Sequence, residues 1–430
     1  PPRAKRGEGD LAESFQEGFY NPSCMSNFAL LKDLIQPAKT KIVLLVMDGL
    51  GGLPRASDDQ TELEAANTPN LDRLAREGCL GQHYPVDIGI TSGSGPGHLG
   101  LFGYDPVHYE IGRGVLEAVG IGFPLTGRDV CARGNFCSLD AQGNISDRRA
   151  GRIPTATCEA LVKKINAANI KVADGVEIFV EPVQDYRFVL VMRGDGLRAN
   201  IDETDPQRTG VPPLTAMARD AASERTAALF NSWIKQATAV IANDHPANGL
   251  TLRGFASDPA LPKYKDVYGL KAGVIAVYPM YRGVSSLVGM DVIPHHAHTV
   301  AEEFETAATV WNDYDFLFIH VKYTDSRGED GNFDAKAKVI EEVDAALPGL
   351  MALKPDVLVV TGDHSTPSQL KSHSWHPVPL MIWAPATVRR DRSESFGERA
   401  CAHGGLGTIH AADIMPLALA HAGRLAKYGA

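Results

Sequence analysis

Six residues of types that bind metal ions lie at or shortly beyond points where strands are expected to end. They are Asp48, Asp325, Asp363, His364, His373 and His376. Carboxylates and imidazoles that converge on one edge of a sheet make a mixed oxygen and nitrogen site, which suits Mn²⁺, Mg²⁺, Co²⁺ or Zn²⁺. Any single acid among them is more simply read as a helix cap or one half of a surface ion pair. Three acids at strand ends, one of them followed directly by a histidine, favour metal binding instead.

A serine among glycines is the second candidate for chemistry. Ser94 lies in the segment 91–98 (TSGSGPGH), ahead of an apolar stretch. The free N–H groups at a helix N-terminus suit a phosphate. A hydroxyl beside a metal ion loses its proton readily and can act as a nucleophile. A plain Gly/Ser/Pro turn is the alternative, and it would be preferred if the acids were absent.

Arginines gather in the middle of this acidic chain. They are Arg133, Arg148, Arg149 and Arg152, with Arg198, Arg253 and Arg282 in glycine-containing loops. Because an arginine can bind a phosphate or a carboxylate through two parallel hydrogen bonds, the clustering indicates an anionic substrate. Surface ion pairs of little energetic value are the alternative, and we expect roughly half of these arginines to contact substrate.

Elements of an α/β domain are needed to bring these side chains together. Short apolar runs rich in β-branched residues predict strands that are buried on both faces. These runs cover residues 41–47, 316–321, 357–361 and 378–383. The expected helices are residues 69–77, 333–347 and 413–422, the first with Thr68 as its N-cap and Gly78 at its end. The alternation predicts an α/β fold with a mostly parallel sheet, whose ligands collect beyond the carboxyl ends of the strands.

The middle of the chain has less regular strands than the two ends. We interpret residues 109–283 as a smaller α/β domain that is inserted into the first and binds the substrate. The two parts of the core domain are then residues 41–108 and 284–430, which complete one sheet flanked by helices. Residues 1–40 are expected to form an N-terminal extension that is partly disordered.

Composition narrows the class of protein. The 430 residues carry 42 Lys+Arg against 52 Asp+Glu, a formal net charge of −10, with 44% hydrophobic and 22% charged residues. These values are typical of a globular protein and exclude intrinsic disorder, a collagenous fibre and a small disulfide scaffold. The acidic balance argues against nucleic acid as a partner. The apolar run before Asp48 is far shorter than the about 20 residues of a membrane span, so no membrane is expected as a partner either.

The cysteines and the first residues of the chain indicate the cellular compartment of the protein. The six cysteines form no CxxC pair and no zinc spacing with histidine, so reduced thiols in a cytoplasmic protein are the simpler reading. The first residues are polar and aperiodic and contain no apolar signal-peptide core. We expect Met25 to be the natural start and residues 1–24 to be an upstream extension.

Eleven motifs, in chain order, resemble those of a known family. They are MDGLGG, ANTPNLDRLAREG, GSGPGHLGLFGYDP, RGNF, DRRAGR, DETDPQ, YPMYRGV, LVGMDV, HVKYTD, TGDHSTP and HPVP. The sequence resembles the archaeal-type cofactor-independent (2,3-bisphosphoglycerate-independent) phosphoglycerate mutases, which also occur in bacteria and belong to the alkaline phosphatase superfamily. The match runs from about residue 40 to the end of the chain. The resemblance implies an alkaline-phosphatase-like core, two divalent metal ions, no need for 2,3-bisphosphoglycerate and a phosphoserine intermediate.

The resemblance also implies roles for individual residues. The ligands of one metal ion would be Asp48, Ser94, Asp363 and His364, and those of the other would include Asp325 and His373. Ser94 would also be the nucleophile that becomes phosphorylated, and Lys322 would neutralise charge on the transferred phosphoryl group. Asp147 and Arg148 would handle the hydroxyls and carboxylate of glycerate. Further clamps on the substrate would be Arg133, Arg253 and Arg282.

Two positions depart from the family pattern. Members of the family often have histidine four residues after the aspartate that stands here as Asp325, whereas this chain has Glu329. A carboxylate binds Mn²⁺ or Mg²⁺ well, so Glu329 is a candidate metal ligand; alternatively His376 takes that place. Gly52 and Leu53 stand where many relatives carry Asp-Arg, so one contact on the phosphate side is expected to be missing.

These observations lead to one expected function and two alternatives. The expected function is that of an isomerase of glycolysis, an intramolecular phosphotransferase that interconverts 3-phosphoglycerate and 2-phosphoglycerate in the cytoplasm. If water reaches the phosphoserine first, the same residues make a metal-dependent phosphohydrolase; a mutase for another small phosphomonoester is closely related. A non-catalytic binding protein on a decayed enzyme fold is the third reading, and the presence of Ser94 and the acids speaks against it. The sequence leaves open whether the chain forms a homo-oligomer.

Overall fold

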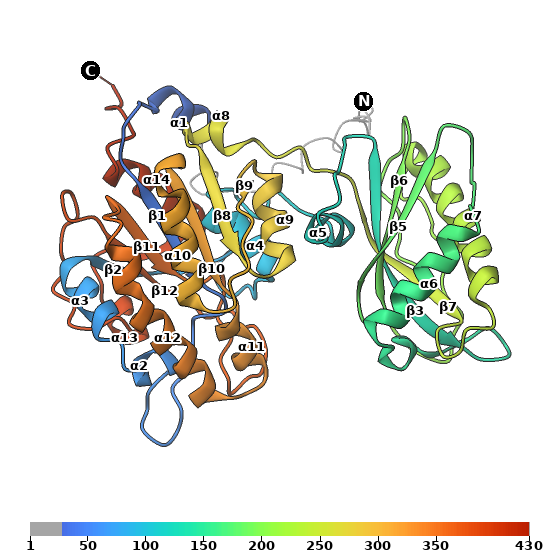
Figure 1. Ribbon diagram of the computed structural model, residues 1–430, viewed down its shortest axis with the longest axis horizontal. Coiled ribbons are helices and arrows are strands. Elements are labelled where there is room, and N and C mark those ends of the chain that lie inside the picture. Colours follow the sequence, from blue (N-terminus) through green and yellow to red (C-terminus); the bar gives the residue numbers. More distant parts are fainter. Residues whose placement is uncertain (1–27, 430) are drawn as a thin grey trace, which may run out of the picture.

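The computed structural model describes residues 28–429 and contains two sheets, each the centre of one lobe in Figure 1. The larger sheet has eight strands in the order β13-β2-β12-β11-β1-β10-β8-β9. Their bounds are β1 (Ile42–Met47), β2 (Cys79–Tyr84), β8 (Ala272–Ala276), β9 (Asp291–Val292), β10 (Phe316–Val321), β11 (Val357–Thr361), β12 (Val378–Trp383) and β13 (Gly407–His410). Strand β12 is antiparallel to both of its neighbours, and the other pairs are parallel. The predicted α/β fold with a mostly parallel sheet is confirmed.

The strands and helices expected from the apolar patterns are present. The four predicted strands are β1, β10, β11 and β12. The predicted helices are α3 (Pro69–Glu77), α12 (Phe333–Met351) and α14 (Ile414–His421). Thr68 precedes α3, but its side chain makes no capping hydrogen bond. Instead Asp344 of α12 accepts the backbone N–H of Leu71 through Oδ1 at 2.7 Å, so a distant helix satisfies the first turn.

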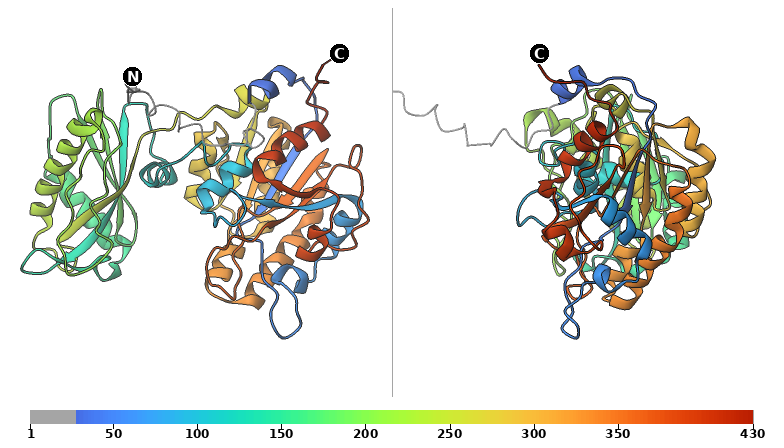
Figure 2. Two further views of the ribbon diagram at one scale, coloured as in Figure 1. Left: turned by 180° about the vertical axis from the view of Figure 1, so that it is seen from behind. Right: turned by 90° about the vertical axis from the view of Figure 1, so that its left-hand side faces the viewer.

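Helices cover both faces of the large sheet (Figure 2). Alternate residues of β1 point to opposite sides, with Leu44 in one buried core and Leu45 in the other, which explains its unbroken apolar run. The first core contains α1 (Phe28–Leu34), α4 (Ser94–Leu101), α8 (Tyr264–Tyr268), α9 (Pro279–Leu287) and α14. The second contains α2 (Glu62–Ala65), α3, α10 (Val300–Val310), α12 and α13 (Glu398–Ala402).

The smaller sheet is antiparallel and has the strand order β4-β3-β6-β5, with β7 beside β3. Its strands are β3 (Asp129–Leu139), β4 (Ile145–Asp147), β5 (Glu177–Gln184), β6 (Arg187–Arg193) and β7 (Gly249–Ala256). Helices α6 (Thr155–Ala167) and α7 (Glu224–Ile241) pack on one face. All of these elements fall inside residues 109–283, whereas β8, near the end of that segment, pairs with β10 in the large sheet.

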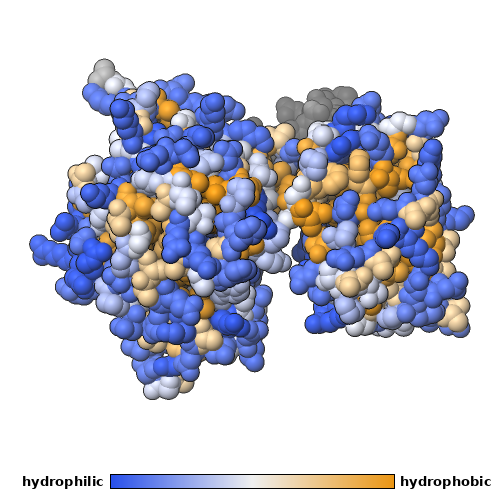
Figure 3. All heavy atoms as spheres, viewed as in Figure 1, coloured by the Kyte–Doolittle hydropathy of each residue, from blue (hydrophilic) through white to orange (hydrophobic). Residues whose placement is uncertain are grey.

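Helix α5 (Arg113–Gly120) lies between the two lobes (Figure 1). Its apolar residues share one buried core with Cys131, Val189 and Val191 of the small sheet and with strands of the large one. A Cβ on Gly114 would lie 2.5 Å from the carbonyl oxygen of Cys131, so only glycine lets the helix approach the small sheet this closely. On the face seen in Figure 3, hydrophilic residues cover most of the large lobe, and apolar residues appear where the small lobe faces it.

Residues 1–27 lie outside the described part of the chain, and with them the expectations for Met25 and for residues 1–24. Further along the expected extension, residues 28–34 form α1, and the ring of Phe28 packs edge-on against Tyr104 with ring centroids 5.0 Å apart. Within residues 28–429, none of the helices combines the length and the apolar character that a membrane crossing requires.

Candidate active site

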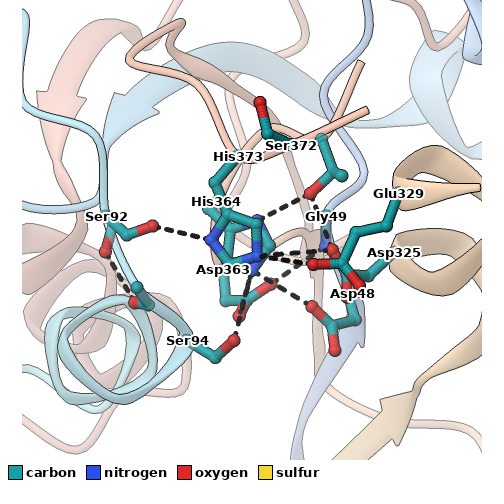
Figure 4. A network of polar contacts seen from close by, with 12 residues as sticks. Asp48, Gly49, Ser92, Ser94, Asp325, Glu329, Asp363, His364, Ser372 and His373 are labelled. Carbon is teal, nitrogen blue, oxygen red and sulfur yellow. Dashed lines mark hydrogen bonds and ion pairs between the residues drawn. The ribbon is translucent and has the colours of Figure 1, made fainter. Parts of the chain in front are cut away.

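The first cluster of candidate metal ligands lies where β1 and β11 end. Asp48 follows β1 directly, and Asp363 and His364 come just beyond β11; all three are fully buried. One ligand atom from each lies within 4.8 Å of the others. Nε2 of His364 is 3.3 Å from Oδ1 of Asp48 and 3.3 Å from Oδ2 of Asp363 (Figure 4). We call these three residues the first ligand group.

A second ligand group shares His364 with the first and adds Asp325 and His373. Asp325 lies in α11 (Tyr323–Glu329), the short helix that follows β10. Nε2 of His373 is 3.6 Å from Oδ1 of Asp325, and the His373 ring stacks on that of His364 with centroids 3.6 Å apart. Nδ1 of His373 lies 2.9 Å from the carbonyl oxygen of Ser92, which leaves Nε2 facing the acids. The two groups are therefore contiguous.

The electrostatics of the first group suit a cation. Oδ1 of Asp48 and Oδ2 of Asp363 are buried and accept no hydrogen bond in the described part of the chain. Burial and the neighbouring Asp48 raise the pKa of Asp363 well above its ordinary value. Burial opposes the charged form of His364 as well, but Asp363 and Asp48 raise the pKa of His364 to about 9. Two buried carboxylates that compete for one proton gain most from a divalent ion, so the residues present fit a metal site.

Lys322 stands between the two ligand groups. Its Nζ is 2.9 Å from Oδ2 of Asp48 and also donates to Oδ2 of Asp325. Burial alone would lower the pKa of Lys322, but the two carboxylates raise it above its ordinary value. The ammonium is therefore a fixed positive charge at the point where the acids of both groups meet.

Ser94 is the first residue of α4, and its hydroxyl points toward His364 (Figure 4). The Oγ atom lies 3.4 Å from Nε2 of His364. The glycines around Ser94 make this approach possible, because a Cβ on Gly97 would lie 2.3 Å from the carbonyl oxygen of Asp363. Pro96 has no N–H and Gly97 donates to Gly93, so the N–H groups of Ser94 and Gly95 at the start of α4 are those that suit an anion beside the hydroxyl.

Glu329 and His376, the two alternatives for a further ligand, lie outside both groups. Oε1 of Glu329 is 3.9 Å from Nε2 of His373, at the end of α11, and the Glu329 side chain is 55% exposed. His376 turns away, with Nδ1 3.0 Å from Oγ of Ser374 and its ring stacked on Trp375. Of the two, Glu329 is the one with an ion-pair contact to a member of the second group, His373.

A cavity of about 560 Å³ opens in front of Ser94, and arginines line it. They are Arg113 of α5, Arg133 of β3 and Arg187 of β6. Nε of Arg187 is buried without a hydrogen-bond acceptor in the described residues, so it is free to donate to an anionic ligand. Nε of Arg133 lies 3.3 Å from Oε1 of Glu117, which lines the same cavity. Arg113 and Arg187 were not singled out from the sequence. The glycines beside Arg113 could have marked it as a candidate anion-binding residue, but no sequence feature near Arg187 indicated such a role.

The other predicted substrate residues are not among those that line the cavity with Ser94. Arg253 of β7 is paired with Arg133 in register and bonds to Glu203 at 3.1 Å. Arg148 makes two hydrogen bonds to Asp205, at 3.1 and 2.7 Å. Asp147, at the end of β4, accepts the backbone N–H groups of Arg149 and Gly151 at 2.8 Å each. Arg282 of α9 lines an adjoining cavity of about 620 Å³ together with Phe123 and Lys263.

A layer of buried aromatic and histidine side chains beneath Asp48 was also missed from the sequence. The hydroxyl of Tyr281 donates to Oδ2 of Asp48, and the ring of His320 stacks on Tyr281 with centroids 3.7 Å apart. Nδ1 of His98 lies 3.3 Å from Oδ2 of Asp363. Burial lowers the pKa of His98 to about 4, so this imidazole is neutral at physiological pH. Tyr281 and His98 thus contact Asp48 and Asp363 and restrict the orientation of these two acids.

Fold and site together are those of an α/β phosphoryl-transfer enzyme: a serine at a helix N-terminus faces clustered carboxylates and imidazoles on one side and arginines on the other. A family model described as 2,3-bisphosphoglycerate-independent phosphoglycerate mutase matches residues 75–248. A protein of Thermotoga petrophila named as a probable enzyme of that kind is 53% identical over 92% of this chain and 98% of its own length. One of Thermus thermophilus is 49% identical over 94% of this chain and 100% of its own length.

Solved structures agree with these relatives. The cofactor-independent phosphoglycerate mutase of Thermoplasma acidophilum superimposes with a TM-score of 0.72 at 29% identity, over 89% of this chain and 100% of its own. A protein of Pyrococcus horikoshii gives a TM-score of 0.76 at 30% identity, over 92% of this chain and 100% of its own. The chain belongs to the 2,3-bisphosphoglycerate-independent phosphoglycerate mutase family, as its motifs predicted.

Proposed function

We propose that the chain interconverts 3-phosphoglycerate and 2-phosphoglycerate through a phosphoserine at Ser94, without 2,3-bisphosphoglycerate, in the cytoplasm. The position of Ser94 carries this proposal. Its Oγ lies 3.4 Å from Nε2 of His364, at a helix N-terminus, and opens on the cavity that Arg113, Arg133 and Arg187 line. Nucleophile, candidate metal ligands and anion-binding groups thus converge on one place, and the names of the relatives support the substrate.

We infer two divalent metal ions, with Mn²⁺, Mg²⁺, Co²⁺ and Zn²⁺ as the candidates. Asp48, Asp363 and His364, joined by the Ser94 hydroxyl, would hold one ion. Asp325 and His373, with Glu329 as a third side chain, would hold the other. When bound, such ions lower the pKa of a coordinated hydroxyl and stabilise negative charge on a phosphoryl group in transfer.

The first half of the reaction forms the phosphoserine. Oγ of Ser94 attacks the phosphorus of 3-phosphoglycerate in line with its bond to O3; the Oγ–P bond forms as the P–O3 bond breaks, the Ser94 hydroxyl gives up its proton, and O3 takes one up. The Lys322 ammonium, fixed between Asp48 and Asp325, balances negative charge on the phosphoryl oxygens. The N–H groups at the start of α4 add hydrogen-bond donors on the same side.

The second half returns the phosphoryl group to the other oxygen of glycerate. The O2 hydroxyl attacks phosphoserine and the P–O2 bond forms as the Oγ–P bond breaks. O2 gives up its proton and Oγ of Ser94 takes one up, so neither half consumes a net proton. Glycerate must stay bound between the halves, and Arg133 and Arg187, which line the cavity with Ser94, are proposed donors to its carboxylate. Asp147, Arg148, Arg253 and Arg282 are proposed as further contacts. In this scheme the small lobe, built on the sheet of β3 to β7 within residues 109–283, holds the substrate and keeps water from the phosphoserine.

An enolase-coupled assay tests this function. The full chain should convert 3-phosphoglycerate without added 2,3-bisphosphoglycerate, lose activity on treatment with a chelator and regain it with Mn²⁺. Hydrolysis of p-nitrophenyl phosphate with no conversion of 3-phosphoglycerate would instead identify a phosphohydrolase. Activity that is indifferent to the chelator would contradict the two-metal proposal.

A further inference from the structure

Lys336 is a buried lysine behind the ligand groups. It lies on α12, and its side chain is fully buried. Nζ donates to the carbonyl oxygen of Gly51 at 3.1 Å and to that of Thr366 at 2.9 Å. Transfer of an ammonium ion into the interior costs several kcal/mol and is sustained only where the charge is well bonded. The burial of this ammonium group therefore calls for a functional or structural reason.

The two carbonyl groups belong to the two loops that carry the proposed metal ligands. Gly51 lies in the loop after β1, which begins with Asp48, and Thr366 lies in the loop after β11, which contains Asp363 and His364. The loops are in direct contact, because the N–H of Thr366 donates to the carbonyl oxygen of Gly51 at 3.0 Å. A Cβ on Gly51 would lie 1.8 Å from Oγ of Ser365. Lys336 thus bonds to both loops at a point where they pack too closely to shift relative to each other.

Two acids, the buried Glu62 and the partly buried Glu398, bond to the same loops. Glu62 accepts the N–H of Ser368 at 2.8 Å, and Glu398 accepts the N–H of Gly52 at 2.9 Å. Burial lowers the pKa of Lys336, and Glu62 and Glu398 oppose that shift by favouring the charged form. Lys336 bonds to carbonyl groups and the two carboxyl groups bond to N–H groups of the same two loops, so together they hold the loops in a fixed relation to each other.

Thr366 connects this support to both ligand groups. Its Oγ1 donates to Oδ1 of Asp325 at 2.8 Å and lies 3.0 Å from Nδ1 of His364. A hydroxyl has a single hydrogen, so Nδ1 of His364 must carry its own and donate it to Thr366. Nε2 of His364 is then the nitrogen that faces Asp48 and Asp363. Thr366 orients one ligand from each group.

We propose that Lys336 is a positioning residue, which sets the spacing of the two metal-ligand loops through its bonds to Gly51 and Thr366. This inference rests on the proposed metal-dependent function. Partners that orient metal ligands typically contribute about 10- to 100-fold to metal affinity. The role differs from a purely structural one because it is read out by metal binding and not by stability alone.

The test compares Lys336→Met with Lys338→Met in the full chain. Lys338 lies on the same helix, but its side chain is 66% exposed and pairs with Glu341. Chelator-treated protein is titrated with Mn²⁺ by calorimetry, and melting temperatures are recorded alongside. We expect Lys336→Met to bind Mn²⁺ about 10- to 100-fold more weakly, with the KM for 3-phosphoglycerate within about twofold of wild type at saturating Mn²⁺. Lys338→Met should bind Mn²⁺ as the wild type does.

A second pair of variants covers the case in which Lys336→Met does not fold. Thr366→Val removes the hydroxyl at constant volume, and Thr366→Ser retains it. The proposal expects Thr366→Val to bind Mn²⁺ at least about tenfold more weakly and Thr366→Ser to remain within about threefold of wild type. Folded Lys336→Met and Thr366→Val proteins with wild-type Mn²⁺ affinity would overturn this inference alone. A wild-type chain that binds no Mn²⁺ would overturn the proposed function and this inference with it.

Discussion

The hydroxyl oxygen of Ser94 lies 3.4 Å from Nε2 of His364, although the two residues come from opposite ends of the sequence. The same nitrogen is 3.3 Å from a carboxylate oxygen of Asp48 and 3.3 Å from one of Asp363. The proposed nucleophile, the imidazole of His364 and two carboxylates therefore lie within a few ångströms of one another. This arrangement is the basis of the proposed chemistry, and the predictions that follow probe its parts one by one.

Replacement of Ser94 by alanine should abolish turnover. The variant lacks the oxygen that accepts the phosphoryl group, so we expect kcat to fall at least about 10³-fold in the enolase-coupled assay. Ser232→Ala, on α7 of the small lobe, serves as the matched control and should retain wild-type kcat. Mutase activity of Ser94→Ala well above background would exclude this serine as the nucleophile.

Glu329 should matter for the second metal ion, and His376 should not. The Glu329 carboxylate is 3.9 Å from His373, whereas His376 bonds to Ser374. We expect Glu329→Ala to weaken Mn²⁺ binding about tenfold and Glu329→His, which replaces the carboxylate by an imidazole ligand, to keep binding close to wild type. Calorimetric titration with Mn²⁺ measures both. Weaker binding by His376→Ala together with unchanged binding by Glu329→Ala would reverse the assignment.

Arg187 should act on substrate affinity. Its Nε is buried without an acceptor in the described residues and lines the cavity in front of Ser94. A hydrogen bond to a charged group contributes about 1.5–3 kcal/mol, so Arg187→Ala should raise the KM for 3-phosphoglycerate about 10- to 100-fold. Arg128→Ala removes an exposed arginine paired with Asp195 and should leave KM unchanged. An unaltered KM for both variants would remove Arg187 from the substrate site.

Glu303 on α10 should make stability depend on pH. Burial, with no compensating charge, raises the pKa of Glu303 to about 8. Between the ordinary carboxyl pKa and about 8 the unfolded chain has released this proton and the folded chain retains it, so the group lowers the free energy of unfolding as pH rises. Glu303→Gln removes this dependence.

The expected result is a melting temperature that exceeds that of wild type by a few degrees at pH 8, with the difference shrinking toward pH 5. Glu305→Gln, on the exposed side of the same helix, is the control and should follow wild type at every pH. A constant difference between Glu303→Gln and wild type across this pH range would show that Glu303 titrates normally in the folded protein.

Much of the framework was predictable because it depends on local patterns. Strand β1 has both faces buried, so its unbroken apolar run predicted a central strand. Asp48 at its end could therefore be placed at the carboxyl edge of the sheet. The direction of β12 was not predictable, because an apolar run reads the same in a parallel and an antiparallel strand. Thr68 is the N-cap of α3, as predicted, but its side chain makes no capping hydrogen bond, and Asp344 satisfies that turn from another helix.

The parts of the site that could not be predicted from the sequence depend on contacts between residues far apart in the chain. Lys336 and Lys338 look alike as two lysines of an amphipathic helix, yet one is buried against Gly51 and Thr366 and the other is exposed. Arg187 reads as an ordinary polar residue at the start of a strand, and only the juxtaposition of the small sheet with α4 brings it to the cavity with Ser94. Positions of this kind follow from tertiary packing and not from spacing along the chain.

The central claim is that Ser94 carries the phosphoryl group between the two oxygens of glycerate. The direct measurement is acid quenching of the Mn²⁺-loaded protein during turnover of 3-phosphoglycerate, followed by peptide mass spectrometry of the segment that contains Ser94. We predict phosphate on Ser94 in the wild type, which disappears in Ser94→Ala. Sustained conversion of 3-phosphoglycerate with no phosphate on Ser94, or with phosphate on another residue, would contradict the account.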